Sequence, residues 1–194
     1  MRITLVYKLT IRDRRGRIIR RIRRRQARSF VIAFLLHLQG AWDRISINIT
    51  DIGNVVRSVY FPGSVVENWM NADGPLGDAN YGPVVGSGTT APAPANYKLE
   101  TQIAHGNGVG QLSHQETAVD DVSIGATTCI LRIRRNFNNN SGAPVDIKEI
   151  GLYCWSRFAI GAAYFCLIRD VLAATFSVPA GGTAQLEYAL TTTV

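Results

Sequence analysis

Large apolar residues recur at every second position in several short runs of this chain, and turn residues separate the runs. The first run extends from Ile3 to Ile11, and the turn-like segment 13–16 separates it from a second apolar run that begins at Ile18. A period of two is typical of a strand that buries one face. We therefore expect the chain to open with a β-hairpin.

The second half of the chain repeats this pattern more densely. The segments between its apolar runs are rich in glycine, asparagine and proline, which are turn residues. The apolar phase shifts near Gly151, which predicts a β-bulge there. Strands at this spacing favour a mainly β fold, a sandwich or a barrel. Of the two, we expect an antiparallel β-sandwich of jelly-roll or Ig-like type. The predicted strands are 97–103, 111–123, 127–137, 144–154, 162–169, 172–178 and 183–193. The side chains expected to be buried between the sheets are Leu131, Ile133, Ile147, Leu152, Phe165, Leu167, Leu186 and Tyr188.

One segment has the periodicity of a helix. Ser29 is a candidate N-cap, and apolar residues follow it at helical spacing from Val31 to Trp42. Gly40 is expected to mark the end of this single α-helix. We expect His37, within the helix, to be a packed or exposed side chain and not a ligand.

The composition divides the chain into four segments. Residues 1–42 hold the basic hairpin and the helix, and 43–61 hold a second predicted hairpin. Residues 62–96 form a Gly- and Pro-rich loop or arm, and 97–194 form the sandwich core, which we expect to be one domain with 1–61. Because few residues of the 62–96 loop could anchor a core, we expect contacts with other subunits to order it.

The net charge of +7 conceals a strong asymmetry. Residues 1–28 hold 12 basic residues against one acidic residue, a balance of +11, and the remaining residues hold 9 basic and 13 acidic residues, a balance of −4. A basic segment on a mildly acidic body indicates contact with a polyanion or with an acidic neighbouring surface. The candidate interaction residues are Arg12, Arg14, Arg15, Arg17, Arg20, Arg21, Arg23, Arg24, Arg25 and Arg28.

The partner of these arginines stays open at this point. Arginine pairs in a planar, bidentate way with both carboxylates and phosphates, so a protein and a nucleic acid are both suitable partners. The arginine run lacks interleaved aromatic residues and accompanies no RNA-binding or helix-turn-helix motif, which argues against sequence-specific recognition of nucleic acid.

The residues that could carry chemistry have no spacing typical of an active site. His105 and His114 lie near Glu100, Glu116, Asp120 and Asp121, but no metal-ligand spacing joins them. The glycine-rich segments 86–88 and 106–110 are not followed by the helix of a phosphate-binding loop. Arg169 and Asp170 are neighbours in the sequence, and Glu149 lies within an apolar run. We expect these residues to form structural ion pairs at strand ends.

The three cysteines, Cys129, Cys154 and Cys166, show no CxxC pattern and are expected to be small buried apolar residues. We expect no catalytic residue, no metal, no cofactor, no small-molecule substrate and therefore no enzyme. The apolar stretch 30–38 is far shorter than the roughly 20 residues needed to span a bilayer, and no signal peptide precedes it, so no membrane partner is expected.

Several strand and turn motifs resemble those of uncharacterised virion structural proteins of tailed bacteriophages. They are the segments 85–100, 103–106, 135–142, 149–153, 168–172 and 178–183, together with the opening hairpin and the Ser29-Phe30-Val31 start of the helix. The resemblance covers most of the chain outside 43–84 and implies a β-sandwich component of a virus particle. The arginine run is heavier than is usual in such proteins.

This resemblance implies a subunit that assembles with copies of itself and with other virion proteins, in a particle assembled in the host cytoplasm. A capsid-associated position is slightly favoured over a tail tube or other tail component. The alternative is a nucleic-acid-associated protein that uses the arginine-rich segment as a nonspecific phosphate clamp. A hydrolase or lectin on a jelly-roll scaffold would need a cluster of carboxylates or aromatic residues, and the sequence shows none.

Overall fold

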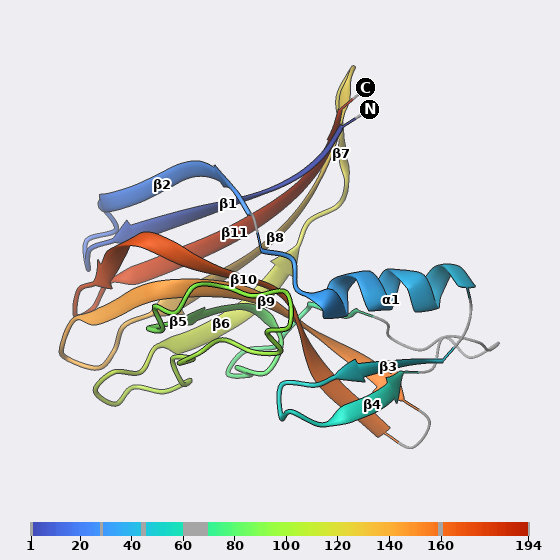
Figure 1. Ribbon diagram of the computed structural model, residues 1–194. Coiled ribbons are helices and arrows are strands. Elements are labelled where there is room, and N and C mark those ends of the chain that lie inside the picture. Colours follow the sequence, from blue (N-terminus) through green and yellow to red (C-terminus); the bar gives the residue numbers. More distant parts are fainter. Residues whose placement is uncertain (1, 28, 44–45, 60–69, 159–160, 194) are drawn as a thin grey trace.

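The described residues, 2–27, 29–43, 46–59, 70–158 and 161–193 of a computed structural model, form two antiparallel sheets and one helix (Figure 1). This arrangement confirms the mainly β sandwich and its N-terminal hairpin. The elements are β1 (Arg2–Arg12), β2 (Ile18–Gln26), α1 (Ile32–Asp43), β3 (Ile47–Thr50), β4 (Val56–Val59), β5 (Gly82–Gly86), β6 (Ser113–Val119), β7 (Ser123–Ile124), β8 (Thr128–Asn138), β9 (Val145–Phe158), β10 (Gly161–Val178) and β11 (Thr183–Thr193).

The first sheet has the strand order β2-β1-β11-β8-β6, with β7 paired to β8. The alternating apolar residues of β1 bury one face of the strand, as predicted. They are Leu5, Tyr7, Leu9 and Ile11. β1 and β11 pair in continuous register over their whole length, from Arg2 opposite Thr193 to Arg12 opposite Thr183. The arginine-rich strand β2 therefore forms one edge of this sheet, and β6 and β7 form the opposite edge.

The second sheet is built on the long antiparallel pair β9 and β10, with β5, β4 and β3 on the other side of β9. The two strands predicted at 162–169 and 172–178 are one strand, β10. The register shift predicted near Gly151 is present, but the extra residue lies on β10, between Cys166 and Ile168, and not on β9. A second shift between Val171 and Phe176 moves the intervening residues out of the ladder.

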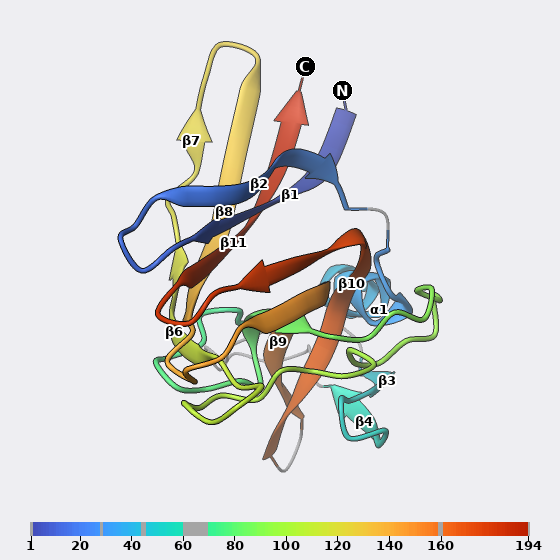
Figure 2. The same ribbon diagram turned by 90° about the vertical axis from the view of Figure 1, so that its left-hand side faces the viewer.

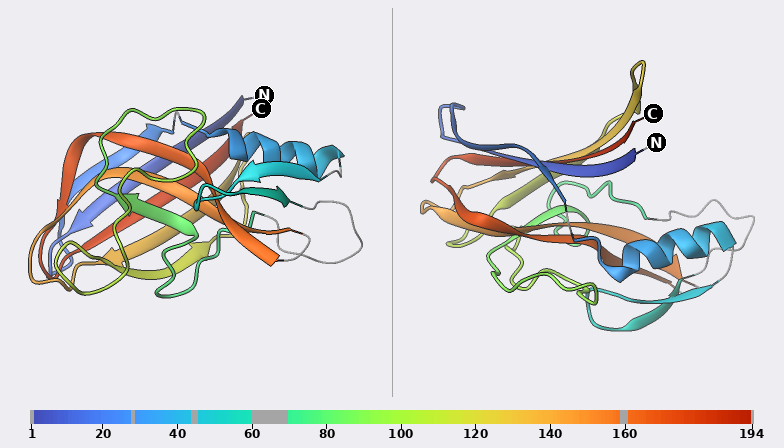
Figure 3. Two further views of the ribbon diagram at one scale, coloured as in Figure 1. Left: turned by 60° about the horizontal axis from the view of Figure 1, so that its bottom comes forward. Right: turned by 45° about the horizontal axis from the view of Figure 1, so that its top comes forward.

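The two sheets diverge toward the end that carries both termini, where the β7–β8 hairpin projects beyond the rest of the molecule (Figures 2 and 3). This divergence explains why two of the residues predicted to lie in the core are not fully buried. Six of the eight side chains expected to be buried are buried, whereas Leu131 and Ile133 of β8 are only half-buried, because the second sheet no longer covers them closely.

The helix begins later and ends later than predicted. Phe30 forms an isolated bridge with Ile168 of β10, and the Ser29 carbonyl accepts a hydrogen bond from the Arg169 amide at 3.1 Å. This extended segment delays the helix to Ile32, so Ser29 is not its N-cap. Gly40 is buried within α1, which continues to Asp43. No helix among the described residues is long and apolar enough to cross a membrane.

The second hairpin predicted within 43–61 is present as β3 and β4, with its turn at 51–54, although residues 44–45 and 60–61 lie outside the described residues. The expectation that few residues of the 62–96 loop could anchor a core is wrong for the described part of the loop. This part contains β5, in which Val84 and Val85 are fully buried against β9, so the segment is anchored within its own chain. Residues 62–69 lie outside the described residues.

The predicted strand 97–103 is an irregular segment that packs on the outer face of the second sheet. Its apolar residues Leu99 and Ile103 are buried, which produced the strand-like pattern. Only its end pairs with a strand, because Ile103 donates its amide to the Val85 carbonyl of β5 at 3.0 Å. The backbone before it bonds to side chains: Thr101 donates its amide to Glu149 at 2.8 Å, and Leu99 donates its amide to the Tyr153 hydroxyl.

A buried ion pair holds this segment in place. The Arg169 Nε lies 2.9 Å from Oε2 of Glu149, and the two side chains are 2% and 0% exposed. Arg169 also donates to Asn96 Oδ1 at 3.0 Å and to the Thr90 carbonyl at 2.9 Å. The pair was expected at strand ends, but it lies within β9 and β10, where it ties both strands to the covering loop.

A second buried arginine anchors the preceding loop. Arg135 of β8 is 1% exposed and donates to the carbonyl oxygens of Gln115, Tyr81, Pro75 and Asp78. Burial lowers the pKa of Arg135 to about 10, so the guanidinium remains charged at neutral pH. Four carbonyl acceptors thus replace its lost hydration, and the loop 75–81 is fixed against β6 and β8.

We predict that Arg169→Met lowers the free energy of unfolding by about 3–5 kcal/mol, because it leaves the Glu149 carboxylate buried without a cation. Lys8→Met is the matched control. The Lys8–Glu187 pair is 2.7 Å long but partly exposed, so its loss should cost at most about 1 kcal/mol. Urea unfolding measures both, and equal losses in the two variants would contradict the anchoring role of Arg169.

Candidate interaction surfaces

The ten arginines identified from the sequence fall into two groups in the structure. The first group closes the turn between β1 and β2. Arg17 forms an ion pair with Asp13 at 2.8 Å, and Arg12 donates to the Gly16 carbonyl at 3.0 Å. Arg14 and Arg15 are exposed on the same turn, and Arg28 lies outside the described residues.

The second group consists of the five arginines of β2. Arg20, Arg21, Arg23, Arg24 and Arg25 line an open groove of about 430 Å³ between β2 and the part of β10 that leaves the ladder. Ile22, Ala173, Ala174 and Phe176 complete its wall. We call this surface the arginine groove.

One arginine of the groove is fixed in place. Arg20 donates to the Thr175 carbonyl, and its guanidinium carbon lies 4.2 Å from the centroid of the Phe176 ring, a cation–π contact. Among the described residues, no carboxylate forms an ion pair with any of the five groove arginines. The groove can therefore accept an anionic group from outside the chain.

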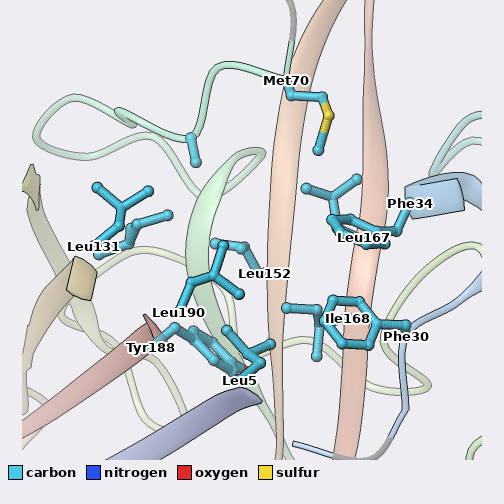
Figure 4. Close-up of a pocket in the computed structure, with 12 residues that line it drawn as sticks. Leu5, Phe30, Phe34, Met70, Leu131, Leu152, Leu167, Ile168, Tyr188 and Leu190 are labelled. Carbon is cyan, nitrogen blue, oxygen red and sulfur yellow. The ribbon is translucent and has the colours of Figure 1, made fainter. Parts of the chain in front are cut away.

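A second surface is apolar and lies where the sheets diverge. A pocket of about 200 Å³ opens between the inner face of the first sheet, through Leu5, Leu131 and Leu190, and the side chains of Phe30 and Phe34 (Figure 4). Met70, Leu152, Leu167, Ile168 and Tyr188 also line it. It contains no charged side chain, so it suits an apolar occupant.

The described residues do not join the histidines and carboxylates of the sequence analysis into one site. The imidazoles of His105 and His114 lie 5.8 Å apart, and the His114 amide donates to His105 Nδ1 at 3.0 Å. Glu100 instead accepts from Thr89 and Thr90, and Asp120 pairs with Arg134 at 2.8 Å. No group of three or more His, Cys, Asp or Glu residues in the described ranges could hold a metal ion.

Burial makes His114 a structural residue. It is fully buried and packs its imidazole against the Phe137 ring, with the centroids 5.0 Å apart. This burial, with the nearby charge of Arg135, lowers the pKa of His114 to about 3. The ring is neutral at physiological pH and is not poised for acid–base chemistry there.

The three cysteines are free, and the predicted burial holds for two of them. Cys154 and Cys166 are fully buried, whereas Cys129 near the start of β8 is half-buried. Burial raises the pKa of the Cys154 thiol to about 12, so the nucleophilic thiolate is not populated at neutral pH.

One candidate interaction surface was not predicted from the sequence. The edge opposite β2, residues 116–124, combines the acidic residues Glu116, Asp120 and Asp121 with the exposed apolar residues Val119, Val122 and Ile124. We call it the acidic edge. Three acidic residues without a nearby basic residue were a usable signal, but only the strand order shows that they lie opposite the arginines.

His37 is buried at the contact between α1 and β9. Its Nδ1–H donates to the Ala33 carbonyl at 2.7 Å, and its Nε2 accepts from the Ser156 hydroxyl at 3.1 Å. Burial lowers the pKa of His37 from 6.5 to about 4. Because the folded pKa lies below the unfolded one, the stabilisation is complete above pH 6.5 and is lost as the pH falls toward 4.

We predict that His37→Gln flattens the pH dependence of stability in this window. A single group with this shift changes the free energy of unfolding by up to about 1.4 kcal/mol per pH unit between its two pKa values. Urea unfolding at pH 7, 5.5 and 4.5 measures the difference between variant and wild type. Parallel losses of stability in the two proteins would show that His37 does not titrate in this way.

Comparison with known proteins finds no family model, no curated protein and no solved structure that matches this chain significantly.

Proposed function

We propose that the protein is an assembly subunit of a virus particle, which associates with copies of itself and with other virion proteins after synthesis in the host cytoplasm. One observation carries the assembly part of this proposal. The β7–β8 hairpin projects from the sandwich, and the segment 119–124, which leads into it from the end of β6, exposes Val119 by 47%, Val122 by 53% and Ile124 by 79%. Large exposed apolar residues that lie close together mark surfaces that another protein covers.

Two further features support a subunit over an isolated protein. The apolar pocket between the diverging sheets is open, and Leu35 and Ile32 of α1 are exposed by 62% and 54%. The resemblance of the strand and turn motifs to virion proteins of tailed bacteriophages supports a virus particle as the assembly. A capsid-associated position remains slightly favoured over a tail position within this proposal.

We predict that the double variant Val122→Ser, Ile124→Ser impairs assembly while it leaves the melting temperature nearly unchanged. Both side chains are mostly exposed in the single chain, so they contribute little to its folding. Light scattering after gel filtration and negative-stain imaging measure particle yield, and calorimetry measures melting.

Val109→Ser is the control for this experiment, because Val109 is 83% exposed in the loop 105–112, away from the hairpin. It should assemble like the wild type. Dispersed wild-type monomers under all conditions, or equal yields from the hairpin variant and the wild type, would contradict the proposed function.

The arginine groove favours a second candidate function, a nonspecific phosphate clamp for nucleic acid. Five arginines along one groove without a carboxylate partner in the described part of the chain suit phosphate groups as well as carboxylates. In this reading, the logarithm of the affinity for duplex DNA falls linearly with the logarithm of salt concentration, with a slope of roughly −0.9 for each phosphate contact.

Fluorescence anisotropy with a labelled DNA duplex at 50–300 mM salt tests this alternative. Replacing Arg21, Arg23 and Arg25 by Ser should then reduce the slope by up to about three contacts. A slope that does not change in the triple variant would exclude the groove as the phosphate site.

A further inference from the structure

The two free edges of the first sheet carry opposite charge. β2 holds five arginines and no acidic residue, a balance of +5. The segment 113–124 at the opposite edge holds Glu116, Asp120 and Asp121 and no basic residue, a balance of −3. Asp120 is paired with Arg134 of β8 at 2.8 Å, so the uncompensated charge of this edge is carried by Glu116 and Asp121, which are exposed and form no ion pair with a described residue.

The two charged segments also lie at the same level along the strands. Arg25 is opposite Tyr7, and the row of cross-strand partners continues through Tyr188 and Ile133 to Val119. A parallel row leads from Ile22 through Leu9, Leu186 and Arg135 to Thr117. The same rows of cross-strand partners therefore run from the arginine groove at one edge of the sheet to the acidic edge at the other.

Both edges add apolar surface to their charge. The arginine groove exposes Ala173 and Ala174 and half-exposes Ile22, whereas Phe176 in its wall is buried beneath Arg20. The acidic edge exposes Val119, Val122 and Ile124 next to its carboxylates. An apolar centre surrounded by paired charges is the usual composition of a protein interface, whereas a site for nucleic acid backbone alone would not need the matching valines and isoleucine.

Direct strand pairing across these edges is disfavoured. The β1–β2 ladder has register shifts between Tyr7 and Leu9 and between Ile11 and Arg12, so β2 is bulged twice. Bulges and charged side chains are the features by which edge strands avoid backbone pairing. The contact must therefore be made by side chains.

We infer that a second copy of this chain docks its acidic edge on the arginine groove. The inference rests on the proposed assembly function and names its contact. Because the two surfaces differ, the contact is heterologous and leaves one free edge of each kind on every pair of copies. Repetition with a constant rotation builds a ring or a helical tube, and the same contact with further neighbours builds a shell.

Complementary charge reversal tests the inference. The groove variant carries Arg21→Glu, Arg23→Glu and Arg24→Glu, and the edge variant carries Glu116→Arg and Asp121→Arg. Each variant alone brings like charges together, so its self-association should weaken by about a hundredfold or more. An equimolar mixture places opposite charges at both contacts and should restore assembly.

Asp146→Arg is the control, because Asp146 is exposed on β9 and belongs to neither edge. It should assemble like the wild type. A chain with all five reversals should also assemble with itself, which keeps the test valid if one variant alone folds poorly. Sedimentation velocity measures association in each sample.

The outcomes separate the inference from the proposed function. If the wild type assembles and both single-edge variants assemble equally well, or if the mixture stays dispersed, the docking contact is wrong and the assembly function survives. If the wild type never assembles, both are wrong. If the groove variant assembles normally but loses nucleic acid, the groove is a phosphate clamp and the docking contact is again wrong.

Discussion

The buried pair of Glu149 and Arg169 is the interaction on which the second sheet depends. It joins the middle of β9 to the middle of β10, and both partners also bond to the irregular segment 88–101 that covers the outer face of the sheet. Glycine at 151 permits this cover, because a Cβ there would lie 3.0 Å from Leu99 Cδ2 and 2.9 Å from the Ile168 carbonyl. Without the Glu149–Arg169 pair, few other polar contacts would hold the segment 88–101 against β9 and β10.

The surroundings of each arginine decide its role. Arg135 and Arg169 are almost completely buried, and their hydrogen bonds hold strands and loops of their own chain. The β2 arginines are exposed at a sheet edge beside an apolar wall. The excess of arginine over lysine therefore serves both purposes, because a planar guanidinium satisfies several fixed acceptors in a core and several carboxylates or phosphates at a surface.

The sequence predicts strands well where one face is buried and the other is exposed, as in β1 and β11. It predicts less where backbone groups bond to distant side chains. Leu99 and Ile103 alternate like strand residues, yet Glu149 and Tyr153, about 50 residues away, hold that segment. The local sequence pattern predicted that the arginines of β2 form an interaction surface, but it did not predict Glu116 and Asp121 as the complementary surface that we propose. Their opposition follows from the strand order, which joins β1 to β11 across the whole chain.

In the proposed assembly, the acidic edge of one subunit lies against the arginine groove of the next. Electron cryomicroscopy of the wild-type assembly tests this contact most directly, because the projecting β7–β8 hairpin makes the orientation of each subunit recognisable. The account predicts continuous side-chain density between residues 116–124 of one subunit and β2 of its neighbour. A map in which β2 faces nucleic-acid density and touches no neighbouring subunit would contradict it.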